Sequence, residues 1–163
     1  MIGLAAMAPA VAGMPSGGDL ADMSLEQLGN VEVTSVSRQP ERLSDAAASI
    51  YVITNDDIRR SGATTLPEAL RLAPNLEVAR VSASTWAISA RGFNNALGNK
   101  LLVLIDGRTV YTPLVSVVFW DAQDVVLEDV DRSEVGSGPG AILWGAKAVN
   151  SVINVITRSS ANT

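Results

Sequence analysis

A glycine-rich turn, Gly136–Ala141, carries the residue types and spacing in this sequence that most directly suggest chemistry. Its G-x-G-x-x-A pattern follows a predicted strand, and such a turn can cradle a pyrophosphate with backbone N–H groups at the start of a helix. Here Pro139 has no N–H to donate and lies inside the cradle. The run Leu143–Gly145 also interrupts the helix whose dipole would attract the phosphates. Because of these departures, a nucleotide-binding enzyme is the least favoured of the three interpretations of this sequence that are weighed below.

A phosphate-binding loop over Gly140–Lys147 fails for similar reasons. Ala146 separates Gly145 from Lys147, and Ala148 stands where a hydroxyl would bind magnesium. We therefore predict no phosphate site in this segment.

Composition excludes several other function classes. The 163 residues include neither Cys nor His, which removes Cys/His zinc sites, thiol nucleophiles and any Ser-His-Asp triad. The net charge is -5, and a nucleic-acid partner calls for clustered Lys and Arg. The sequence predicts no enzymatic activity, no metal site, no cofactor and no nucleic-acid partner.

The glycines have a simpler interpretation as backbone geometry between two strands. Glycine permits a tight turn there, and the tryptophan that follows can pack on the core. The residues of this predicted structural turn are Gly138, Pro139, Gly140, Trp144 and Gly145.

Local signals upstream predict short helices and strands. Capping patterns open helices at Ser24, at Thr54 and at Thr65, the last with Glu68 as its capping glutamate, and Gly62 and Pro74 end the second and third helices. Strands are predicted at 31–36, 50–53, 76–81, 86–90, 101–105, 132–135 and 152–157, and Val125–Val130 fits a helix or a strand. The predicted fold is α+β, with a small mixed β-sheet and two or three short helices.

The N-terminus has the composition of an export signal. Met1–Ala12 is apolar and small, and Ala10–Ala12 forms an A-x-A pattern like that at a signal-peptidase site. Because a basic leading region is missing, we expect the true start to lie upstream; a disordered Ala/Gly/Pro leader is the alternative.

The final third of the chain resembles the end of the plug domain of TonB-dependent outer-membrane receptors, whose motif is close to I-E-V-I-R-G-P-G-A-x-x-W-G-x-x-A-x-x-G-V-I-N-I-I-T. The matching residues are Glu134, Val135, Gly138, Pro139, Gly140, Ala141, Trp144, Gly145, Ala148, Val152, Ile153, Asn154, Ile156 and Thr157. The resemblance continues upstream through Tyr51–Thr54, Pro67–Leu70, Ser89–Asn94 and Leu102–Arg108, and covers roughly Leu25 to Arg158.

By its position, Val31–Val36 resembles the TonB box, the short segment that the energy-transducing protein TonB captures in this family. The proposed TonB-binding residues are Val31, Glu32, Val33, Thr34, Ser35 and Val36. An extended, β-branched segment can add as a strand to the sheet edge of a partner. The alternative is an ordinary strand of the domain's own sheet.

The resemblance also implies contacts between plug and barrel. Arg91 is similar to a plug arginine that pairs with barrel glutamates, and a guanidinium suits that pairing because it is permanently charged and forked. A solvated surface arginine is the alternative. The second locking arginine of the family precedes the glycine turn, and Ser137 stands there in this chain.

Loops that touch the ligand in family members correspond to two segments here. Asn94 and Asn95 offer hydrogen bonds to a polar ligand, and Tyr111 and Trp120 lie in the apolar segment 111–121. The alternative, that the aromatic side chains complete the core, is favoured for Phe119 and for Trp120.

Together these features predict the plug domain of a TonB-dependent outer-membrane receptor, which gates energy-coupled uptake of a scarce ligand such as a siderophore or cobalamin. The expected organisation is an export signal and linker (1–23), a TonB-box-like segment and connector (24–43), the plug (44–158) and the start of a connection to a barrel outside this chain (159–163). The expected partners are the TonB C-terminal domain, the barrel and a small-molecule ligand, at the periplasm-facing side of the outer membrane. The alternative is a free-standing periplasmic binding or adaptor module that engages TonB without a barrel.

Overall fold

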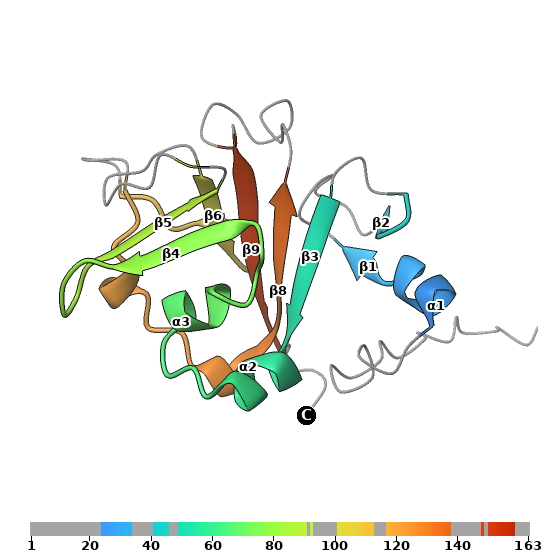
Figure 1. Cartoon of the computed structure of the whole chain (residues 1–163), viewed down its shortest axis with the longest axis horizontal. Coiled ribbons are helices and arrows are strands. Elements are labelled where there is room, and N and C mark those ends of the chain that lie inside the picture. Colours follow the sequence, from blue (N-terminus) through green and yellow to red (C-terminus); the bar gives the residue numbers. More distant parts are fainter. Residues whose placement is uncertain are drawn as a thin grey trace, which may run out of the picture.

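A computed structural model describes residues 24–33, 41–45, 49–90, 92, 101–112, 117–137, 148 and 150–158 of the chain (Figure 1). The helices are α1 (Leu25–Gly29), α2 (Asn55–Ser61) and α3 (Leu66–Leu70), with 3₁₀-helices η2 (Trp120–Ala122) and η3 (Leu127–Asp129). The strands are β1 (Glu32–Val33), β2 (Glu41–Arg42), β3 (Ser49–Thr54), β4 (Leu76–Arg80), β5 (Trp86–Ala90), β6 (Leu101–Ile105), β7 (Arg108–Thr109), β8 (Val130–Ser137) and β9 (Ser151–Thr157).

A five-stranded mixed sheet in the order β3-β8-β9-β6-β7 organises the molecule. Its pairs are antiparallel except β6 with β9, which run parallel from Leu101 opposite Ser151 to Ile105 opposite Val155. Four of the five β6 residues are buried, as a continuous apolar run in an inner strand requires. The predicted α+β fold with a small mixed sheet is confirmed.

Apolar side chains cover both faces of this sheet. On one face Ile53, Val103, Val135 and Ile153 pack in the main core, which also takes in residues of α2, α3 and the β4–β5 hairpin. Figure 1 shows the hairpin and the two helices gathered on this side. On the other face Leu102, Leu104, Ala148 and Val152 form a second, smaller cluster. Alternation along β6 and β9 therefore feeds two apolar layers.

Helix α2 begins and ends where the sequence predicts. The Thr54 hydroxyl accepts from Asp57 N–H, and the Asp57 carboxylate accepts from Thr54 N–H, which completes a capping box. Gly62 ends the helix with a φ of 69°, a conformation that glycine adopts without steric cost.

Helix α3 differs from the prediction at both ends. The Thr65 side chain makes no capping hydrogen bond, and the Glu68 carboxylate instead accepts from Thr64 N–H and Thr64 Oγ1, both at 2.9 Å. These bonds, the backbone bond first, lower the pKa of Glu68. The helix ends at Leu70 rather than at Pro74, because Leu72 and Ala73 bond to carbonyls three residues earlier and tighten the chain into turns.

Other elements also depart from their predicted bounds. The strand predicted at 31–36 has only Glu32 and Val33 paired among its described residues, as β1. β8 is longer than predicted, and the ambiguous segment 125–130 forms η3 and then enters β8. Within the described ranges, every helix is too short or too polar to cross a lipid bilayer.

Candidate functional site

Two connections between strands, from β5 to β6 and from β8 to β9, contain several of the predicted site residues. The strand ends that flank both connections lie at one end of the sheet. β5 ends at Ala90 and β6 begins at Leu101; β8 ends at Ser137 and β9 begins at Ser151. Ser151 lies opposite both Leu101 and Ser137 in the strand register. Because the Asn150 side chain donates to the Ala90 carbonyl at 3.3 Å, the end of β5 is tied to the same place. This loop end of the sheet is at the top of Figure 1.

Two hydrogen bonds fix the flanks of the glycine turn. The Ser151 hydroxyl, fully buried, donates to the Gly136 carbonyl at 2.5 Å. The Asn75 side chain donates to the hydroxyl of Ser137, which stands where the resemblance predicts the second locking arginine. Ser137 therefore joins β8 to the segment after α3. The turn residues Gly138, Pro139, Gly140, Trp144 and Gly145 lie outside the described residues.

The R-G-F segment is described only at Gly92. Its φ of 85° is in the left-handed region, where a side chain would be strained even though space is open around it. This conformation gives a physical reason for glycine in the motif. Arg91, Asn94 and Asn95 lie outside the described residues, so their predicted roles remain predictions.

After β7 the chain runs back along β6 toward the loop end of the sheet, and Tyr111 lies on this stretch. The preceding residue, Val110, donates its N–H to the Val103 carbonyl at 3.2 Å, and Tyr111 packs against both apolar clusters. Burial raises the pKa of its phenol from 10.0 to about 12. Tyr111 is therefore held as a largely apolar, protonated side chain near the start of β6.

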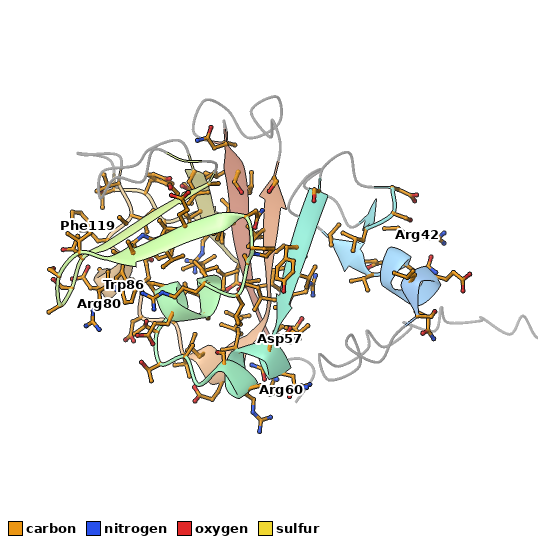
Figure 2. All side chains as sticks on the ribbon, in the orientation of Figure 1. Arg42, Asp57, Arg60, Arg80, Trp86 and Phe119 are labelled. Atoms are coloured by element: carbon orange, nitrogen blue, oxygen red, sulfur yellow. The ribbon has the colours of Figure 1, made fainter. Side chains whose placement is uncertain are left out.

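The neighbouring aromatic residues Phe119 and Trp120 have opposite environments. Trp120 is 7% exposed in the main core, as the core interpretation predicts. Phe119 is 48% exposed, so the prediction that it completes the core is wrong. Figure 2 shows it at the margin of the molecule, on the same side as Trp86 and Arg80. The structure thus presents Phe119, rather than Trp120, to the surroundings.

The first half of the predicted TonB-binding segment is paired within the chain. Glu32 lies opposite Arg42 and Val33 opposite Glu41, while Leu43 N–H donates to the Val31 carbonyl at 2.8 Å. Val33 is fully buried. This pairing agrees with the alternative of an intrachain strand, although the β1–β2 sheet is separate from the main sheet. Thr34, Ser35 and Val36 lie outside the described residues.

Sequence reasoning used Glu134 only as a motif match and missed its charge environment. Its side chain is fully buried, and Glu134 Oε1 accepts from Arg132 Nε at 3.0 Å. Arg132 Nη1 also contacts Asp131 Oδ2 at 2.9 Å, next to a register shift between β8 and β9. A bulge at such a shift changes the direction in which side chains point. This explains how the side chains of Asp131 and Arg132 come together although the two residues are adjacent in the strand. Glu134 also lies opposite Asn154 on β9, so polar groups interrupt the second sheet face.

In the described part of the chain, the ion pairs and cation–π contacts lie away from the loop end of the sheet. These ion pairs lie on α2, between Arg60 and Asp56, and around Arg132. Arg71 and Arg80 contact the buried Trp86 ring through cation–π interactions, at 5.5 and 5.3 Å from its centroid.

Comparison with known proteins identifies the family to which this architecture belongs. The family profile described as the TonB-dependent Receptor Plug Domain matches residues 42–152. The vitamin B12 transporter BtuB of Vibrio vulnificus (strain CMCP6) is 32% identical over 136 residues, which are 82% of this chain and 22% of the relative.

Solved structures agree with this match. The ferric citrate transporter FecA in its unliganded form has a TM-score of 0.59 and 28% identity, covering 72% of this chain and 18% of that one. The ferripyoverdine receptor of the outer membrane of Pseudomonas aeruginosa, bound to ferripyoverdine, has a TM-score of 0.59 and shares the fold at 21% identity, over 78% and 16% of the two chains. The chain thus spans less than a quarter of the length of each of these relatives.

Proposed function

This chain belongs to the family of TonB-dependent receptor plug domains, and from that membership we propose that it gates the energy-coupled uptake of a scarce ligand through an outer-membrane receptor. The observation that carries this proposal is the family match, which includes β3, β6, β7 and β8 of the main sheet and reaches the start of β9. The named relatives are transporters and receptors, and a non-enzymatic role is proposed here too.

The ligand-facing part is proposed to be the loop end of the sheet. The loops that hold Arg91, Asn94 and Asn95 and the glycine turn leave from this end, and Tyr111 lies beside β6 near it. The names of the relatives include vitamin B12, ferric citrate and ferripyoverdine. A ligand of similar class, a cobalamin or an iron chelate, is proposed for this chain.

Partners follow from the same proposal. Arg91 pairs with glutamates of the receptor barrel, and Val31–Val36 binds the TonB C-terminal domain from the periplasmic side. Because Val33 lies opposite Glu41 in the β1–β2 pair, capture by TonB along this edge of β1 requires β1 to leave β2. The β1–β2 pair has only two residues in each strand and is separate from the main sheet, so few ladder hydrogen bonds oppose its opening.

Titration of the full chain with the TonB C-terminal domain tests this assignment. Val33→Pro removes a backbone donor from the added strand and is expected to abolish binding, whereas Val33→Thr keeps both the donor and the β-branched shape and retains it. Unchanged affinity of Val33→Pro would place the TonB-binding segment elsewhere. Tighter binding of this variant would show that β1–β2 pairing only masks another site.

A further inference from the structure

Three separate segments hold the end of β9. Thr157 donates its N–H to Asp106 Oδ1 at 2.8 Å and its hydroxyl to Asp106 Oδ2 at 2.9 Å. Arg158 donates its backbone N–H to the Asp129 carbonyl at 2.8 Å, and its guanidinium Nη2 donates to Asn55 Oδ1 at 2.9 Å. The contacts come from the turn after β6, from η3 and from the start of α2. Two consecutive residues thus make four hydrogen bonds to distant parts of the chain.

Asp106 is also held by contacts that do not involve Thr157. It has a φ of 49°, and Gly107 after it has a φ of 76°, so both occupy the left-handed conformations of a tight hairpin turn between β6 and β7. Asp106 N–H donates to the Val155 carbonyl at 2.9 Å. The turn is therefore already anchored on β9, and its carboxylate faces Thr157 at little entropic cost.

Asn55 connects Arg158 to the rest of the fold. It is 5% exposed, and its Nδ2 donates to the Val130 carbonyl at 2.7 Å and to the Leu127 carbonyl at 3.2 Å. Because its amide nitrogen faces carbonyls, its oxygen is the atom that faces Arg158. One buried side chain thereby links α2, the junction of η3 with β8, and the end of β9.

We propose that Asn55 and Asp106 form an exit clamp that fixes the direction in which the chain leaves β9, and that displacement of α2 releases Arg158 from this clamp. Helix α2 follows the edge strand β3 directly, and Figure 1 shows the lower end of β9 beside α2. A shift of β3 and α2 removes Asn55 from Arg158, while Asp106 continues to hold Thr157. The clamp therefore couples the edge of the sheet to its exit, whichever segment binds TonB.

Limited trypsin digestion of the full chain tests the coupling, because trypsin binds the guanidinium of the residue before the cleaved bond and Asn55 holds the guanidinium of Arg158. Asn55→Ala is expected to raise cleavage after Arg158 about tenfold relative to cleavage after the exposed Arg108 in the same digest. The matched control is Ser61→Ala, which loses a 2.7 Å bond to the Ile58 carbonyl at the other end of α2 and leaves the ratio unchanged.

A ratio in folded Asn55→Ala equal to that of the parent chain overturns the clamp. If Asn55→Ala does not fold, Asp106→Gly decides, since glycine keeps the left-handed turn and removes only the carboxylate. Hydrogen exchange of the Thr157 amide is then expected to accelerate about tenfold while the amides of β4 stay unchanged. Thr157 exchange at the original rate in Asp106→Gly refutes the clamp.

Discussion

Two buried serines on neighbouring strands show how one hydrogen bond separates a stabilising residue from a costly one. Ser133 on β8 is 1% exposed, and its hydroxyl has no hydrogen-bond partner among the residues that the structure describes. Ser151 on β9 is fully buried too, but its hydroxyl bonds to the Gly136 carbonyl. A buried polar group without a partner loses the hydration that it has in the unfolded chain.

Ser133→Ala is therefore expected to leave the free energy of unfolding unchanged or raise it by about 1 kcal/mol, whereas Ser151→Ala lowers it by about 1 kcal/mol. Urea denaturation followed by tryptophan fluorescence compares the two variants with the parent chain. A loss of stability in Ser133→Ala equal to that in Ser151→Ala would contradict the difference.

At the scale of elements, the short helices depend on their ends more than on their length. Helix α2 has seven residues, too few to be stable alone, and its capping box and Gly62 satisfy groups that the helix leaves unpaired. Helix α3 has five residues and obtains its start from proline and from burial of Leu66 and Leu70 rather than from Thr65. The capping patterns at Thr54 and Thr65 are similar in sequence, but only the Thr54 side chain caps its helix.

Thr54→Ala is expected to lower the free energy of unfolding by about 1 kcal/mol, because it removes the acceptor of the Asp57 N–H. Thr65→Ala is the matched control and is expected to change it by less than about 0.5 kcal/mol, since Thr65 makes no side-chain cap. Thermal denaturation monitored by circular dichroism measures both variants. Equal losses would show that the Thr65 side chain also caps its helix.

At the scale of the whole molecule, the sheet joins two apolar layers, and Tyr111 packs on both. Its phenol is neutral in the folded and unfolded chain below its unperturbed pKa of 10.0. Between 10.0 and about 12 the unfolded chain loses this proton while the folded chain keeps it. Rising pH therefore favours unfolding across this window.

The free energy of unfolding is expected to fall more steeply with pH in the parent chain than in Tyr111→Phe, from pH 10 up to about 12. The variant has the same other titrating groups, so the difference between the two curves isolates Tyr111. Urea denaturation at a series of pH values across this range provides the measurement. Parallel curves would mean that the folded chain does not protect the Tyr111 proton.

The sequence by itself determined the elements whose signals lie within a few residues. The cap at Thr54 and the strand at 101–105 are both read from neighbouring residues and are both confirmed. Family resemblance, confirmed by the match over 42–152, gave the fold. The roles of Val31–Val36, Arg91, Asn94 and Asn95 remain predictions.

Only the tertiary structure decided which distant groups meet. Asn55 reaches Arg158 across 103 positions, Asn75 reaches Ser137 across 62, and β6 pairs in parallel with β9. The opposite environments of Phe119 and Trp120 also depend on where the 3₁₀-turn meets the core. Which distant residues become hydrogen-bond partners depends on how the whole core packs, and the spacing of neighbouring residues in the sequence does not determine it.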